Sequence, residues 1–158
     1  MQEVTRLSEL IKFEVTVSYR LARATTAFRN ALERRMGVIG LHGGQIFILF
    51  ELWNSNGRTQ VDLARSLGVS APTINKMVKG LIEIGLVTRN KIDDDGRSTR
   101  IFLTPQGYSI RSEIEAQWLE LEEYCLSGLT ETERLVLFDL LGKLKSIYTG
   151  RADDGEEE

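Results

Sequence analysis

The spacing of hydrophobic residues predicts long helices at both ends of the chain, with a shorter mixed segment between them. Residues 5–36 contain no proline or glycine, and their apolar residues recur every three or four positions, which predicts one long helix. The same spacing predicts a second long helix from Pro105, and a capping box at Thr130–Glu133 begins a last one. Between them, the strongly apolar residues 45–53 are expected to form the central helix of the core.

Residues 60–81 have the pattern of two short helices joined by a tight turn. Gly68 suits a left-handed residue at the end of the first helix, Ser70 is a good N-cap, and Pro72 falls in the first turn. The side chains expected to face inward are Val61, Leu63, Ala64, Leu67, Ile74, Met77, Val78 and Leu81. The outer face of the second helix then carries Thr73, Asn75, Lys76 and Lys79. This pattern resembles a helix-turn-helix, although an ordinary helical hairpin is the simpler alternative.

A β-hairpin is predicted directly after this helical pair. Residues 86–91 and 98–103 favour strands, and the turn Asp93–Gly96 between them ends in a glycine suited to positive φ. Arg58, just before the helical pair, is placed to join the hairpin briefly. A hairpin in this position is a wing, and Arg97 lies at its tip.

The distribution of charge is more informative than the net charge of −3. Residues 58–104 carry eight basic and five acidic side chains, a net charge of +3, so the rest of the chain carries −6. A phosphate backbone would attract only the central segment. The composition therefore gives modest support to binding of nucleic acid.

Several classes of function are disfavoured by what the sequence contains. With one cysteine, Cys125, and one histidine, His42, neither a disulfide framework nor a metal site of several such residues is expected. We expect no cofactor and no enzyme, because there is no glycine-rich phosphate loop and no nucleophile paired with histidine. No apolar run is long enough to span a bilayer, and no signal-peptide pattern is present, so a cytoplasmic protein is expected.

The chain resembles the MarR family of winged-helix transcription regulators over residues 5–148. The resemblance rests on the long first helix, the helix-turn-helix, the run Gly85–Arg89, the wing turn Asp95–Arg97 and the segment Leu103–Gly107. It implies a mainly α fold with a small β-hairpin wing. The parts implied are dimerisation helices in 1–36 and 105–150, a winged helix-turn-helix in 37–104, and a disordered acidic tail in 151–158.

The resemblance also implies a homodimer that binds double-stranded DNA, most simply as a repressor. Its recognition helices would enter successive major grooves at half-sites about 10 bp apart, while Arg97, held by Asp95, would enter the minor groove. The residues expected at DNA are Ser70, Thr73, Asn75, Lys76, Lys79, Asp95 and Arg97. The alternative is a helical homodimer that binds other proteins and has a degenerate wing, which the acids at Asp93–Asp95 favour.

Regulators of this kind often release DNA when a small aromatic ligand binds between the dimer helices and the winged unit. Candidate lining residues here are Arg20, His42, Gln45 and Trp53, although all four are equally well read as core and surface residues. Cys125 is expected to be structural, because the neighbouring Glu122 and Glu123 would raise the pKa of its thiol.

Overall fold

The computed structural model describes residues 12–91 and 99–150. Asp95, Arg97 and the predicted acidic tail lie outside the described residues. The chain divides into two compact units, Met1–Leu121 and Glu122–Glu158, and each is described by itself.

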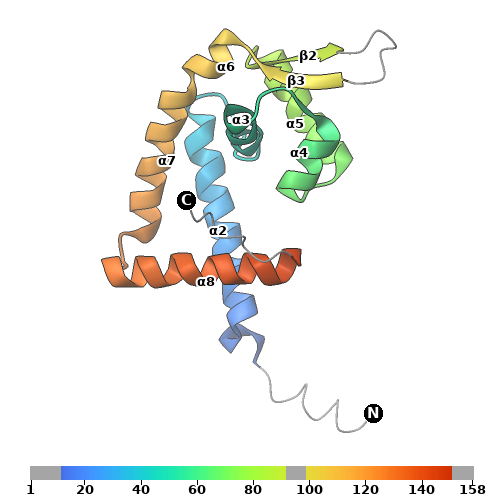
Figure 1. Ribbon diagram of the computed structural model, residues 1–158. Coiled ribbons are helices and arrows are strands. Elements are labelled where there is room, and N and C mark those ends of the chain that lie inside the picture. Colours follow the sequence, from blue (N-terminus) through green and yellow to red (C-terminus); the bar gives the residue numbers. More distant parts are fainter. Residues whose placement is uncertain (1–11, 92–98, 151–158) are drawn as a thin grey trace, which may run out of the picture. The chain divides into compact units, whose positions relative to one another are not determined.

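The described part is mainly helical, with one small antiparallel sheet (Figure 1). Its elements are η1 (Phe13–Val15), α2 (Val17–Gly37), α3 (Gln45–Asn54), β1 (Arg58–Thr59), α4 (Gln60–Leu67), α5 (Ala71–Glu83), β2 (Val87–Lys91), β3 (Thr99–Leu103), α6 (Pro105–Ser109), α7 (Arg111–Leu126) and α8 (Glu131–Thr149). The strands lie in the order β1–β3–β2, and Arg58 pairs with Ile101. The predicted fold class and the brief pairing of Arg58 with the hairpin are therefore confirmed.

The prediction of one unbroken helix over residues 5–36 is wrong within its described part. Thr16 has extended φ and ψ angles of −80° and 145°, and it separates η1 from α2. Its hydroxyl accepts a hydrogen bond from the Tyr19 N–H at 3.3 Å and donates to the Phe13 carbonyl at 2.7 Å. A threonine hydroxyl competes with helical bonding in this way. The apolar spacing continues through Thr16 and hides the break.

The core of the first unit is built around α3, as predicted. Ile46, Ile48, Leu49 and Leu52 are all fully buried on this helix. Other elements contribute the buried side chains Leu32, Met36, Leu41, Leu63, Ile74, Val78, Leu81, Leu86, Val87, Ile101, Leu103, Ile114 and Leu121. The helical pair and the sheet therefore share one hydrophobic core with α3, which holds the winged region together.

The helix-turn-helix forms as predicted. Gly68 ends α4 with φ of 63°, and the Ser70 hydroxyl accepts from the Thr73 N–H to cap α5. Leu63 on α4 and Ile74 on α5 are fully buried. The inward position predicted for Val61 is wrong, since this side chain is 64% exposed. α4 has only eight residues, and its buried face is narrower than the apolar spacing suggests.

The helix predicted from Pro105 is divided into α6 and α7 at Ile110. In an unbroken helix the Gly107 carbonyl would accept from the N–H of residue 111. Here it accepts a hydrogen bond from the Trp53 indole at 3.0 Å. The break between α6 and α7 is thus a tertiary effect, because the group that bonds the Gly107 carbonyl belongs to Trp53 on α3.

In the second unit, α8 begins with the predicted capping box. The Thr130 hydroxyl accepts from the Glu133 N–H, and the Glu133 carboxylate accepts from the Thr130 N–H at 2.8 Å. No residue of α8 is buried, and its apolar side chains Phe138, Ile147 and Tyr148 are at least 70% exposed. Cys125 is exposed as well, and the expectation that it has a structural and not a redox role stays a prediction.

Among the helices of residues 12–91 and 99–150, none combines the length and the apolar character that crossing a membrane requires.

A carboxylate joins α2 to the start of α3. Glu33 lies 2.6 Å from Nδ1 of His42 and accepts a hydrogen bond from the Gly43 N–H at 2.7 Å. These bonds, that of His42 first, lower the pKa of the Glu33 carboxyl below its ordinary value. The ionised carboxylate therefore stabilises the folded state.

Because this pKa is lower in the folded state than in the unfolded state, the stabilisation is present above the unfolded value of 4.5. It is lost as the pH falls through the lower folded value. We expect Glu33→Gln to reduce the melting temperature by roughly 2 °C at pH 7. At about pH 3 the difference should shrink, which thermal unfolding followed by circular dichroism would measure. A difference that grows on acidification would contradict this role.

Candidate nucleic-acid interface

The N-terminal turn of α5 presents polar side chains on an exposed surface. Ser70, Thr73, Asn75 and Lys76 are all exposed, whereas Ile74 between them is fully buried. The hydroxyls of Ser70 and Thr73 lie 2.8 Å apart, so the cap holds both in place. A helix N-terminus also offers unpaired backbone N–H groups that favour anions such as phosphate. This face can therefore meet both bases and backbone of a duplex.

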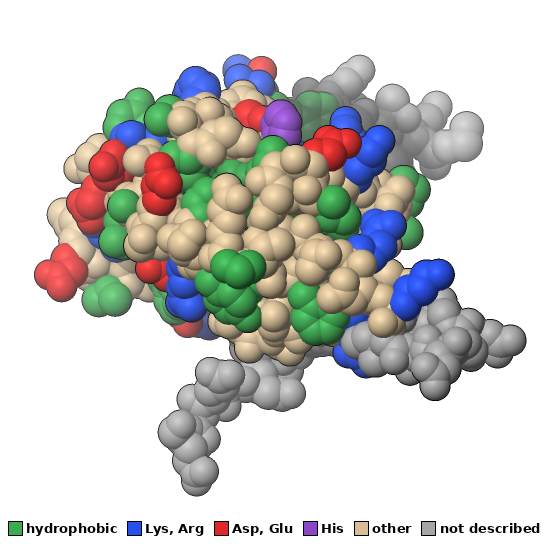
Figure 2. Space-filling model, turned by 90° about the horizontal axis from the view of Figure 1, so that it is seen from above, with side chains coloured by type: hydrophobic (Ala, Val, Ile, Leu, Met, Phe, Trp, Pro, Cys, Tyr) green, Lys and Arg blue, Asp and Glu red, His purple; other side chains and the backbone are tan. Residues whose placement is uncertain are grey.

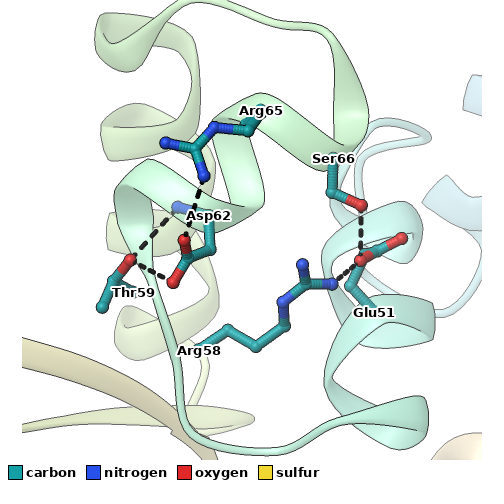
Figure 3. Close-up of polar contacts among 6 residues, drawn as sticks. All are labelled: Glu51, Arg58, Thr59, Asp62, Arg65 and Ser66. Carbon is teal, nitrogen blue, oxygen red and sulfur yellow. Dashed lines mark hydrogen bonds and ion pairs between the residues drawn. The ribbon is translucent and has the colours of Figure 1, made fainter. Parts of the chain in front are cut away.

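A half-buried carboxylate holds α4 against the core helix (Figure 3). Glu51 on α3 accepts a hydrogen bond from the Ser66 hydroxyl at 2.7 Å and forms an ion pair with Arg58. Arg58 lies in β1 and Ser66 near the end of α4, so one carboxylate connects three elements. No feature of the sequence marked Glu51, which is a single acid within an apolar helix.

The start of α4 is held by a second cluster (Figure 3). The Thr59 hydroxyl accepts from the Asp62 N–H at 3.1 Å and donates to the Asp62 carboxylate at 2.6 Å. The Thr59 hydroxyl is the main group that lowers the pKa of the Asp62 carboxyl, and the positive charges of Arg65 and Arg58 lower it further. The ionised Asp62 carboxylate and the Thr59 hydroxyl together cap the N-terminus of α4.

The wing strand β3 is tied to the turn that precedes β1. The Asn56 side-chain oxygen accepts from the Leu103 N–H at 2.9 Å, and Arg100 donates to the Gly57 carbonyl at 2.9 Å. Gly57 has φ of 78°, and an added Cβ would lie 2.6 Å from Phe102. No feature of the sequence marked Asn56 or Arg100 as the residues that tie β3 to this turn.

The described part of the winged region has a basic surface. Exposed basic side chains occur on α4, α5 and β2, namely Arg65, Lys76, Lys79, Arg89 and Lys91. Of the acids in these elements, Asp62 is bound to Thr59 and Glu83 lies 3.8 Å from Lys79. Lys and Arg side chains gather along the right-hand edge of the face shown in Figure 2. The predicted local excess of positive charge is thus present at the surface.

The structure brings together five of the seven residues predicted at DNA. These five lie at the N-cap or on the exposed side of α5, namely Ser70, Thr73, Asn75, Lys76 and Lys79. The other two, Asp95 and Arg97, lie outside the described residues.

Two of the four candidate ligand residues, His42 and Gln45, contact each other, and no contact within the described part of the chain joins all four. Gln45 is only 4% exposed, and its side-chain oxygen accepts from the His42 N–H at 2.8 Å. The His42 ring contacts the Glu33 carboxylate, and the Trp53 indole donates a hydrogen bond to the Gly107 carbonyl. Arg20 is exposed on α2. Among the contacts between described residues, none joins Arg20 or Trp53 to His42. Their role toward a ligand stays a prediction.

Aromatic side chains from three elements gather around Phe50. Its ring centroid lies 5.7 Å from that of Trp53 and 5.5 Å from that of Trp118. Phe47 lies 6.1 Å from Phe50, and Phe28 lies 6.1 Å from Trp118. These edge and tilted contacts are favourable for aromatic pairs. The cluster joins α2 and α7 to the core helix beneath the winged region.

Comparison with known proteins places this arrangement among regulators. The family model described as the MarR family matches residues 41–99. The curated relative YdgJ of Bacillus subtilis (strain 168), an uncharacterized HTH-type transcriptional regulator, is 26% identical over 110 residues. That alignment covers 68% of this chain and 65% of the relative, so the chain spans just under two thirds of the relative's length.

Solved structures resemble the chain over most of its length. A probable transcriptional regulator from Pseudomonas aeruginosa is 27% identical with a TM-score of 0.77, covering 84% of this chain and 99% of its own. The transcriptional regulator PA3341 is 30% identical with a TM-score of 0.71, covering 86% of this chain and 100% of its own. The winged helix-turn-helix is therefore shared with proteins of regulatory function.

Proposed function

The chain belongs to the MarR family of transcriptional regulators, and on that premise we propose that it is a homodimeric repressor that binds an inverted-repeat DNA operator. The observation that carries this proposal is the exposed polar face of α5. Its helix is capped by Ser70, and the helix beneath it is held to the core through Glu51. A rigid helix with polar residues at its N-terminal end suits the major groove.

Five side chains of this face are proposed to contact DNA, namely Ser70, Thr73, Asn75, Lys76 and Lys79. Asparagine can make paired hydrogen bonds to a base edge, and lysine can reach guanine or phosphate. The hydroxyls at the N-cap and the free N–H groups of the first turn suit phosphate oxygens. Arg97 is proposed to enter the adjacent minor groove, with Asp95 orienting its guanidinium.

A second copy of the chain is proposed to cover the exposed apolar side chains at both ends. Phe13, Val15 and Val17 at the start of the described chain are about 70% exposed or more. On α8, Leu135 and Phe138 are exposed to a similar degree. Burying such side chains is worth about 1.5–3 kcal/mol each, which supports association. Two recognition helices would then read half-sites about 10 bp apart.

Release of DNA by a small aromatic ligand is also proposed. Support comes from the partly exposed rings around Phe50, which include Trp53. Arg20, His42 and Gln45 are proposed as the polar residues that would contact the ligand. An aromatic ligand could stack against these rings, and Arg111 already lies 5.5 Å from the Trp53 ring centre.

Selection of bound duplexes from a random DNA pool tests the proposal. We expect an enriched inverted repeat with half-sites about 10 bp apart, and binding that weakens steeply as salt rises. Sedimentation of the same sample should show a dimer at micromolar concentration. If no duplex is enriched at low salt, the alternative of a protein-binding helical dimer is favoured instead.

A further inference from the structure

A side chain outside the predicted DNA-binding set contacts the recognition helix. The Gln60 amide nitrogen on α4 donates a hydrogen bond to the Asn75 side-chain oxygen on α5 at 3.4 Å. Asn75 is exposed, and Gln60 is half-buried between the two helices. Asn75 belongs to the predicted DNA-binding set, whereas Gln60 does not.

Gln60 occupies a fixed position. It follows Thr59, the N-cap of α4, whose hydroxyl bonds the Asp62 backbone and carboxylate. The preceding residue, Arg58, is paired with Glu51 and bonded into the sheet opposite Ile101. The backbone that carries Gln60 is therefore held on both sides, and its side chain can act as a reference point for Asn75.

We propose that Gln60 determines base specificity by orienting the Asn75 amide. An asparagine side chain has an acceptor end and a donor end that differ only by rotation of the amide. With its oxygen turned toward Gln60, Asn75 presents its NH₂ group outward. This proposal rests on the proposed binding of DNA through α5. It specifies which hydrogen-bonding groups of a base Asn75 would recognise.

A donor presented to the major groove favours base edges that accept hydrogen bonds. Guanine offers the two acceptors O6 and N7, and thymine offers O4, whereas adenine offers its N7 acceptor beside an N6 amino donor that an outward NH₂ group cannot satisfy. An unconstrained asparagine would favour adenine, because it can accept from N6 and donate to N7. Gln60 thus shifts the preference of Asn75 from adenine toward guanine or thymine.

Substitution of Gln60 by glutamate provides a sharp test. An ionised carboxylate only accepts hydrogen bonds, so the Asn75 NH₂ should turn toward it and the oxygen should face the groove. We expect wild-type protein to enrich guanine or thymine about fivefold over the other bases at the Asn75 position. Gln60→Glu should reverse this preference toward adenine or cytosine, whose exocyclic amino groups donate. Gln60→Ala, which removes the partner, should favour adenine.

The position that Asn75 reads is identified with Asn75→Ala, which should lose the preference there alone. Gln106→Glu is the matched control, because it adds the same charge at an exposed residue of α6 and should leave the preference unchanged. Equal base preferences for wild type and Gln60→Glu, or a wild-type preference for adenine or cytosine, would overturn the inference while DNA binding stands. Absence of any enriched duplex with wild-type protein would overturn the proposed function and this inference with it.

Discussion

Replacing Lys76 with glutamate is expected to lower the affinity for the selected operator about a hundredfold at physiological salt. Lys76 is exposed on α5, one residue beyond Asn75 and close to the helix N-terminus. A carboxylate there would repel phosphate and lose the attraction of the ammonium group. Since the proposed dimer uses two recognition helices, it would lose this binding free energy at both half-sites. A mobility-shift titration across several salt concentrations would measure both the affinity and its salt dependence.

Lys145→Glu is the charge-matched control, because Lys145 is exposed on α8 and lies outside the proposed DNA-binding set. We expect it to retain affinity within about threefold. The slope of log affinity against log salt is negative. Substitution of Lys76 by alanine should make it less steep by about two, because a dimer would lose one phosphate contact in each copy. Sedimentation of each variant verifies that the dimer is retained. Equal affinities of the two charge reversals would remove α5 from the DNA interface.

Replacing Gly107 with alanine is expected to destabilise the fold by about 3 kcal/mol or more. An added Cβ would lie 2.1 Å from the Leu86 carbonyl oxygen and 3.2 Å from the Leu103 side chain. That carbonyl accepts from the Thr104 N–H at 3.0 Å, so moving it would disturb the bond that brings β3 back to the end of α5. Gly107 is buried, and no flexible side chain can yield to the new atom.

The melting temperature of Gly107→Ala should fall by roughly 6–12 °C, as measured by calorimetry. Gly37→Ala is the matched control, because the Cβ it would add meets no atom within 4 Å beyond its chain neighbours and the backbone of its own helix. We expect a change within about 2 °C. A Gly107→Ala protein as stable as the control would show that α6 can move away from Leu86.

Much of the local structure follows from the sequence because short-range sterics and capping determine it. Gly68, with its left-handed φ of 63°, and the hydroxyl caps of Thr59, Ser70, Thr104 and Thr130 all stand where local rules place them. The segment Leu103–Gly107 was identified only as a motif. The structure supplies its physical reason, which is the close approach of Gly107 to the Leu86 carbonyl.

The errors arose where a helical spacing continued through a local competitor or depended on a distant partner. Thr16 interrupts the first helix through its own hydroxyl, although the apolar repeat runs past it. Trp53 takes the Gly107 carbonyl from 54 residues away and divides α6 from α7. Val61 has an inward position in the apolar repeat and lies exposed instead. Periodicity measures which residues could share a face, and tertiary packing decides which of them are covered.

The amino-acid sequence by itself determined the mainly helical class, the order of the elements, the cap of the recognition helix and the polar residues on its outer side. Each of these depends on interactions within a few residues. Only the tertiary structure decided that Glu51 connects α3 with β1 and α4, that Asn56 holds β3, and that Gln60 contacts Asn75. These contacts join residues 7 to 47 positions apart. Nothing in local spacing specifies such pairs, because they exist only after the shared core has brought the helices and the sheet together.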